Sequence, residues 1–122
     1  MIADCIVIGL GGAIGAVARY LVGLAVPAPR NGFPAGTFII NIAGAFCIGI
    51  IIALSAKHTD INPRLVKFLK IGICGGFTTF STFSLESAGL LQNGRTFTGF
   101  FYMAVSVFAG IAAIYAAEAI IR

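Results

Sequence analysis

The feature that most constrains this chain is an apolar segment, residues 65–92, interrupted near its middle by the glycine pair Gly75-Gly76. Its length and hydrophobicity are typical of a membrane span, whereas glycines are poor helix formers. Irregular backbone at membrane depth is tolerated only where protein buries it or water reaches it, because unpaired backbone groups are costly in hydrocarbon. The sequence therefore predicts a helix broken at Gly75-Gly76, with the Thr, Ser and Phe residues after it forming the functional centre.

Three further apolar runs accompany this segment. The chain has 122 residues, of which 59% are hydrophobic and 10% are charged, and its mean hydropathy is +1.04. A soluble domain of this length cannot bury so much apolar surface, so the composition indicates an integral membrane protein. We predict a single all-α membrane domain over residues 1–122, with four transmembrane helices at residues 4–26, 36–56, 65–92 and 97–121. The first run has no preceding basic stretch and no cleavage site after it, so we interpret it as a retained span.

The composition also excludes several classes of function. The net charge is +4, but the basic residues are spread over loops and span ends, so we predict no nucleic-acid partner. Cys5, Cys47 and Cys74 lack metal-ligand spacing, and we interpret them as small buried hydrophobic residues without disulfides. His58 lies in a polar loop and is given no role. No His, Cys or paired-carboxylate constellation is present, so the chain is predicted not to be an enzyme.

Small residues in two of the predicted spans favour close packing between helices. They form a ridge in the first span and a stripe in the second, made of Gly11, Gly12, Gly15 and Ala16 and of Ala45 and Gly49. Small residues at a spacing of four let two helix backbones approach each other closely. We therefore expect each of these helices to contact a neighbour along these residues.

Polar residues inside the predicted spans are few, and two readings stay open for most of them. Arg19 either extends to the lipid headgroups as an anchor or lines a polar vestibule that attracts anions. Asn41 either makes a hydrogen bond between helices or contacts a ligand. Tyr102 and Ser106 lie one turn apart on the fourth span and share a face.

The residues after the glycine pair fall on two neighbouring helix faces. Phe80 and Phe83 are three residues apart on one face, and Thr79, Thr82 and Glu86 lie on the next. The edge of an aromatic ring carries positive potential, so two such edges can attract a small anion without a formal countercharge. The alternative is that the two rings only pack between helices.

The distribution of basic residues gives only a weak orientation signal. With four spans, Lys57, Arg64, Lys67, Lys70 and Arg122 lie on one side and Arg19, Arg30 and Arg95 on the other. A firm orientation requires a much stronger imbalance of Lys and Arg between the two sides. Insertion in both orientations is therefore physically open.

Three ordered motifs together resemble the Fluc, or CrcB, family of microbial fluoride channels. They are Gly11-Gly12-Ala13-Ile14-Gly15-Ala16 with Arg19-Tyr20, Gly36-Thr37 with Asn41 and Gly44, and Gly75-Gly76-Phe77-Thr78-Thr79-Phe80-Ser81-Thr82-Phe83-Ser84. The resemblance covers nearly the whole chain and agrees with four spans. The fourth span carries little signature of its own.

The resemblance implies a fluoride-selective channel in a bacterial plasma or inner membrane that passively exports fluoride from the cytoplasm. It implies an antiparallel, dual-topology homodimer with two pores along the subunit interface. The implied fluoride pathway consists of Asn41, Phe80, Phe83, Ser81, Thr82, Glu86, Tyr102 and Ser106, with Arg19 in the vestibule. The main-chain carbonyls of Gly75 and Thr78, contributed by both subunits, would hold a structural sodium ion.

Glu86 differs from the other residues of the implied pathway, because a carboxylate beside an anion path repels the anion. We expect Glu86 to be protonated, or to accept hydrogen bonds from the Ser81 and Thr82 hydroxyls. The alternative is a capped residue near the membrane interface.

Two other classes of protein remain possible from the sequence. A small proton-coupled multidrug-type exporter also has four short spans and dual topology, but it needs a carboxylate in its first span. Only Asp4 is available there, so such an exporter would have to use Asp4 or Glu86. A non-transporting assembly or regulatory membrane protein would explain the glycine ridges but would leave Asn41 and the Thr/Ser cluster without a role.

Overall fold

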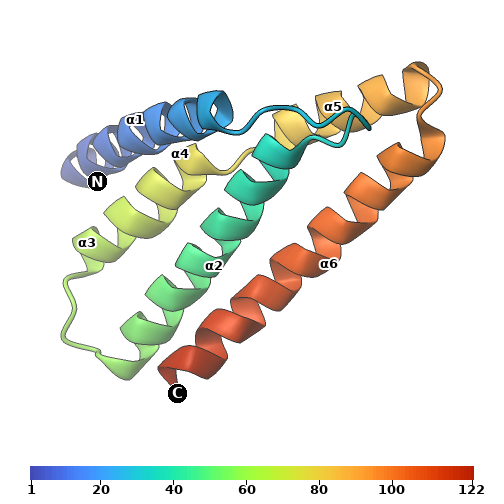
Figure 1. The fold of residues 1–122 in the computed structure, drawn as a ribbon. Helices are drawn as coiled ribbons and strands as arrows, with labels where there is room; N and C mark the ends of the chain where they lie inside the picture. Colours follow the sequence, from blue (N-terminus) through green and yellow to red (C-terminus); the bar gives the residue numbers. More distant parts are fainter.

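The computed structural model describes all residues from Met1 to Arg122, and the chain is helical throughout, without strands (Figure 1). The elements in chain order are α1 (Ile2–Ala25), α2 (Ala35–Lys57), α3 (Pro63–Lys67), the π-helical η1 (Phe68–Cys74), α4 (Gly75–Phe77), α5 (Phe80–Gln92) and α6 (Thr96–Ile121). This confirms the prediction of an all-α chain.

Three of the helices, α1, α2 and α6, are long and apolar enough to cross a membrane. Their bounds agree with the predicted spans to within two residues at each end. The remaining predicted span is a broken segment whose first half, residues 63–77, comprises α3, η1 and α4, and whose second half is α5. Each half is too short to cross hydrocarbon alone, since a crossing helix needs about 20 residues.

The position of the break differs from the predicted one. Gly75 is helical, with φ −64° and ψ −39°, and the helix continues to Phe77. Extended backbone is found instead at Thr78, where ψ is 157°, and at Thr79, where φ is −150° and ψ is 118°. The prediction of a break at Gly75-Gly76 was therefore wrong by a few residues.

The glycines serve close packing rather than chain bending. A Cβ atom at Gly11 would lie 2.7 Å from the carbonyl oxygen of Phe68, and one at Gly15 would lie 2.8 Å from the amide nitrogen of Phe77. A Cβ atom at Gly76 would lie 2.9 Å from Cα of Gly12. The ridge predicted on the first span is thus confirmed as the contact of α1 with η1 and α4.

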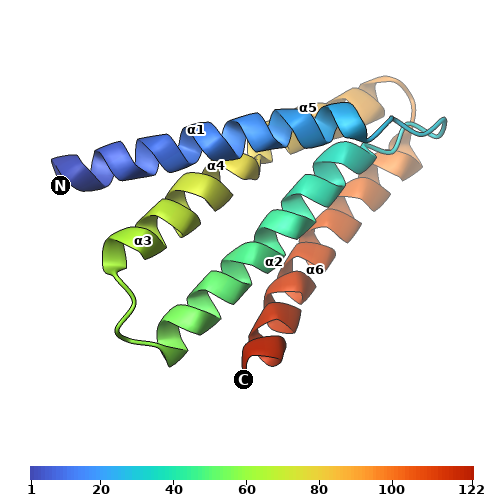
Figure 2. The ribbon, with the colours of Figure 1, turned by 60° about the vertical axis from the view of Figure 1, so that its left-hand side comes forward.

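A second contact joins α2 and α6, which run side by side in both views (Figures 1 and 2). A Cβ atom at Gly49 would lie 2.8 Å from Cβ of Ala117, so Gly49 belongs to a close-packed stripe as predicted. Helix α6 reaches α2 and α5, whereas α1 contacts the broken segment and α2. The chain therefore consists of two helix pairs with the break of the third segment between them.

The chain buries little of itself. Only 13 of its 122 residues are buried, so lipid or another chain has to cover most of its apolar side chains. All three cysteines are free; Cys74 is buried, but Cys5 and Cys47 are exposed in the single chain. The prediction that all three are buried was therefore wrong for two of them, since their helix faces point away from the neighbours in this chain.

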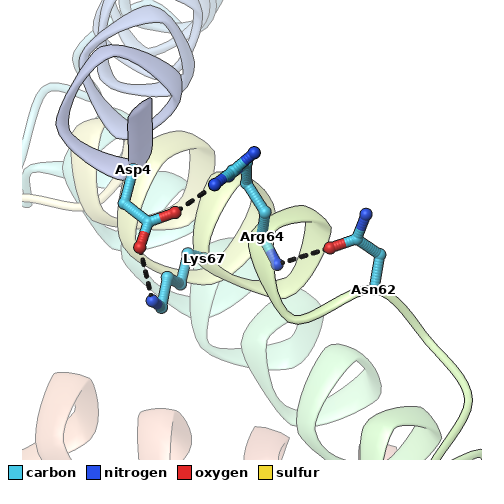
Figure 3. Close-up of polar contacts among 4 residues, drawn as sticks. All are labelled: Asp4, Asn62, Arg64 and Lys67. Atoms are coloured by element: carbon cyan, nitrogen blue, oxygen red, sulfur yellow. Dashed lines mark hydrogen bonds and ion pairs between the residues drawn. The ribbon is translucent and has the colours of Figure 1, made fainter. Parts of the chain in front are cut away.

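An ion-pair cluster ties the start of α1 to the start of the broken segment (Figure 3). The Asp4 carboxylate accepts hydrogen bonds from Arg64 Nε at 2.9 Å and from Lys67 Nζ at 2.7 Å. The Asn62 side chain caps α3 by accepting from the Arg64 amide at 2.9 Å. Exposed ion pairs contribute only about 0.2–1 kcal/mol each, so the cluster fixes the register of the two ends more than it stabilises the fold.

Replacing Gly76 with alanine is expected to lower the free energy of unfolding by about 1–3 kcal/mol, because the new methyl group meets the Gly12 backbone, which cannot rotate away. Thermal unfolding of the detergent-solubilised protein measures the effect. The matched control is Gly9→Ala in α1, where a Cβ atom meets nothing within 4 Å. Equal stability of the two variants would show that the contact between α1 and α4 is looser than described.

Candidate functional site

The break in the third segment is stabilised by its own threonines. The Thr78 hydroxyl donates to the carbonyl oxygen of Cys74 at 2.9 Å, which closes the end of the first half. Thr79 is the N-cap of α5, and its hydroxyl oxygen accepts from the Thr82 amide at 3.2 Å. Such side-chain caps satisfy the backbone groups that a helix end leaves free.

Asn41 of α2 makes two hydrogen bonds with the backbone of the break. Its Nδ2 donates to the carbonyl oxygen of Thr79 at 3.1 Å, and the Thr79 amide donates to its Oδ1 at 2.8 Å. One amide side chain thus pairs both backbone groups of the residue at the break. The amide nitrogen carries a second hydrogen, which remains for another acceptor.

Arg19 of α1 also contacts the backbone near the break. Its Nε donates to the carbonyl oxygen of Gly76 at 3.1 Å. The Arg19 side chain is thus bonded to the backbone of the broken segment. It also lines a cavity of about 270 Å³ together with Thr37, Thr79 and Thr82.

A larger cavity, of about 390 Å³, is also lined by Thr79. It brings together six of the residues predicted from the sequence, namely Asn41, Gly75, Thr78, Phe80, Phe83 and Ser106. The Ser106 hydroxyl oxygen is buried and has no hydrogen-bond partner in the chain. Because an unpaired buried hydroxyl costs about 1–3 kcal/mol, this group favours a water or a ligand in the cavity.

The aromatic residues at the cavity form a short row. The ring centroids of Phe80 and Phe83 are 5.9 Å apart, with an angle of 42° between the ring planes. Phe83 and Tyr102 have centroids 5.1 Å apart. Tyr102 is fully buried, whereas Phe80 is 79% exposed. The row therefore begins inside the chain and ends on a face that this chain leaves uncovered.

Glu86 has different partners from those predicted. Its carboxylate accepts from the Thr37 hydroxyl and from the Tyr102 hydroxyl, each at 3.0 Å. The expectation that it accepts from Ser81 and Thr82 was wrong, because Glu86 faces α2 and α6 while Ser81 is exposed at the start of α5. Thr37 was missed as a site residue, although it lies one turn before Asn41 on the same helix.

Ser81 and Thr82 stay close to the break itself. The Ser81 hydroxyl lies 3.4 Å from the Thr79 hydroxyl. Thr82 lines the smaller cavity with Arg19. Apart from Ser81, which lies beside the Thr79 hydroxyl, the predicted site residues fall into three groups: the large cavity, the Arg19 cavity and the Glu86 cluster with Thr37 and Tyr102.

The two carbonyls predicted to hold sodium lack their usual helical partners. In a continuous helix the Gly75 and Thr78 carbonyls would accept from the amides of Thr79 and Thr82. Those amides donate instead to Asn41 Oδ1 and to the Thr79 hydroxyl oxygen. Free carbonyl oxygens suit a hard cation, so the donor set fits the predicted ion. No cluster of His, Cys, Asp and Glu suitable for a metal is present.

The fold and the site together define a small multi-pass membrane protein with a polar centre built at a broken helix. Residues 6–117 match the family model described as "CrcB-like protein, Camphor Resistance (CrcB)", and the chain belongs to this family.

Several relatives share about two fifths of their residues with the chain and carry one common name. A protein of Chlorobium luteolum (strain DSM 273 / BCRC 81028 / 2530) is 44% identical over 110 residues, covering 90% of this chain and 85% of its own. A protein of Rhizobium meliloti (strain 1021) is 40% identical over 118 residues, which cover 96% of this chain and 94% of the relative. Each is named "Fluoride-specific ion channel FluC". These relationships support a multi-pass protein of a bacterial membrane.

Proposed function

We propose that this chain is a fluoride-selective ion channel that passively exports fluoride from the cytoplasm. The observation that carries the proposal is the large cavity beside the helix break, where Asn41, Phe80, Phe83 and Ser106 come together. Relatives 40–44% identical to the chain are named as fluoride-specific channels. They support a transport function rather than an enzymatic one.

The cavity offers fluoride several weak donors in place of water. The second amide hydrogen of Asn41, the unpaired hydroxyl of Ser106 and the edges of Phe80 and Phe83 all suit a small anion. A pore needs sites that replace hydration without holding the ion too tightly, and a series of neutral donors meets this need better than one cation.

Two further groups extend the proposed pathway. Ser81 and Thr82 supply hydroxyl groups at the start of α5, and the Glu86 cluster contains the hydroxyls of Thr37 and Tyr102, whose protons go to the Glu86 carboxylate. Because both Glu86 oxygens already accept from hydroxyls, the carboxylate is directed away from the cavity that contains Phe80. Arg19 would raise the local concentration of anions at the vestibule, since clefts of one sign concentrate their counterions.

We further propose that the pores form between two antiparallel copies of the chain, with the broken segment acting as a fourth crossing. Support comes from the high exposure of Phe80, from the small buried core and from the weak charge bias of the loops. A single chain of this size has no room for a pore of its own. In the dimer, the Gly75 and Thr78 carbonyls of both copies would hold a structural sodium ion, which would supply positive charge at the centre.

The proton-coupled exporter is less well supported. Such a protein needs a carboxylate free to exchange a proton for a cationic substrate. Asp4 is already paired with Arg64 and Lys67, and Glu86 is engaged by two hydroxyls.

Purified protein in liposomes tests the proposal. Liposomes loaded with fluoride are expected to release it passively when the membrane potential is relieved, and liposomes loaded with chloride are expected to retain their salt. Ion-selective electrodes record both, with protein-free liposomes as the control. Absence of fluoride release, or a pH change that depends on an organic cation, would contradict the channel.

A further inference from the structure

The break is held from both sides by side chains of other helices. Asn41 of α2 pairs with the backbone of Thr79, and Arg19 of α1 donates to the carbonyl oxygen of Gly76. Gly76 lies two residues before Thr78, the first extended residue, and Thr79 directly follows it. The extended conformation is thus bracketed by one bond from α1 and two from α2.

The glycine ridge of α1 explains why Arg19 reaches this point. Gly15 packs directly against the amide of Phe77, and Arg19 follows one turn later on the same face. The last carbonyls of a helix have no intrahelical donor and carry partial negative charge, so a cation is favourable there. Arg19 is partly buried and its Nε is the atom that makes the bond.

We propose that Arg19 is a positioning residue whose Nε–H fixes the end of the first half-segment at Gly76, and that this bond maintains the geometry on which ion selectivity depends. The claim about selectivity rests on the proposed function, whereas the claim about geometry does not. This positioning role depends on the Nε–H of Arg19. Attraction of anions is a separate role and depends on the charge of the guanidinium group.

Three side chains at position 19 separate the two roles. In glutamine, the amide nitrogen is the same number of bonds from Cα as Nε of arginine, so Arg19→Gln keeps a donor at that reach and removes the charge. Arg19→Met removes both the donor and the charge. Arg30, exposed in the first loop, gives the matched control Arg30→Met.

Cys74 offers a reporter that needs no fluoride. It is 5% exposed, lines the large cavity and lies two residues before Gly76. With the exposed Cys5 and Cys47 replaced by serine, labelling by a small maleimide measures how often the end of the half-segment opens. We expect Arg19→Met to label up to about tenfold faster, as suits the loss of one hydrogen bond. Arg19→Gln is expected to label within about twofold of the parent.

Liposome flux then tests selectivity. Arg19→Met is expected to lose the preference for fluoride over chloride, a ratio that a simple loss of folded protein leaves unchanged. Arg19→Gln is expected to keep that ratio while losing more flux at low salt than at high salt, since salt screens the attraction between the Arg19 charge and anions in the surrounding solution.

Equal labelling of Cys74 in the glutamine and methionine variants would overturn the positioning role. If the methionine variant does not fold, fast labelling in a folded Arg19→Gln protein contradicts the proposal by itself. If the parent protein carries no fluoride, the proposed function fails, but the labelling result still decides whether Arg19 holds the break.

Discussion

Replacing Asn41 with aspartate is expected to stop fluoride flux. The substitution puts an oxygen in place of the Nδ2 that donates to the Thr79 carbonyl, so two acceptors face each other at the break. It also places a negative charge at the cavity that contains Phe80 and Phe83. A unit charge about 4 Å from the ion interacts with about 4 kcal/mol at an effective dielectric constant of about 20. This corresponds to a roughly thousandfold lower flux, measured as fluoride efflux from liposomes.

The control for this variant is Asn93→Asp in the exposed turn after α5, which makes the same chemical change away from the site. It should conduct as the parent does. Size-exclusion chromatography of both variants shows whether they are folded. Normal flux through a folded Asn41→Asp protein would remove Asn41 from the ion path and leave it with the role of holding Thr79.

The membrane helices were the part of the structure that the sequence predicted well. Their bounds follow from hydrophobicity and length, because a helix has to satisfy its backbone across the whole hydrocarbon layer. The helix contact along the glycine ridge could also be predicted, since small residues at a spacing of four in a membrane helix usually serve close helix packing. The contact of Gly11 and Gly15 with the broken segment confirms this.

The position of the break was harder to predict because two roles of glycine compete. Glycine weakens a helix, but it also lets another backbone come close, and at Gly76 the contact with Gly12 prevails. The residues that indicate the position of the break are Thr78 and Thr79. Thr78 donates back to Cys74, and Thr79 caps the next helix, a use of hydroxyls that competes with helix continuation.

The partners of individual polar side chains depend on how the helices are rotated against one another. Periodicity along α5 places Glu86 on a face with Thr79 and Thr82. It does not show which other helix that face contacts. In the structure it meets Thr37 of α2 and Tyr102 of α6. These partners lie far from Glu86 in the chain, and the spacing of residues within one segment does not predict contacts between segments.

The second large effect is expected at the aromatic row. Phe80→Ile and Phe83→Ile are each expected to lower fluoride flux by up to about tenfold, because isoleucine fills a similar space without the positive ring edge. The scale is that of edge-to-face contacts between aromatic rings, which are worth about 0.5–1.5 kcal/mol. Isoleucine is apolar and of similar size, so either replacement should lower the free energy of unfolding by less than about 1.5 kcal/mol. Flux and thermal unfolding of the same preparations measure the two effects.

Phe97→Ile at the start of α6 provides the control, since Phe97 is 83% exposed and lies away from the cavity. It should conduct normally. The contrast between Phe80 and Phe97 is informative because both rings are exposed in one chain, and only a ring that a second subunit brings to the ion path can affect flux. Unchanged flux in both Phe80→Ile and Phe83→Ile would make these rings packing residues, and a pore between two copies at this face would then have to be abandoned.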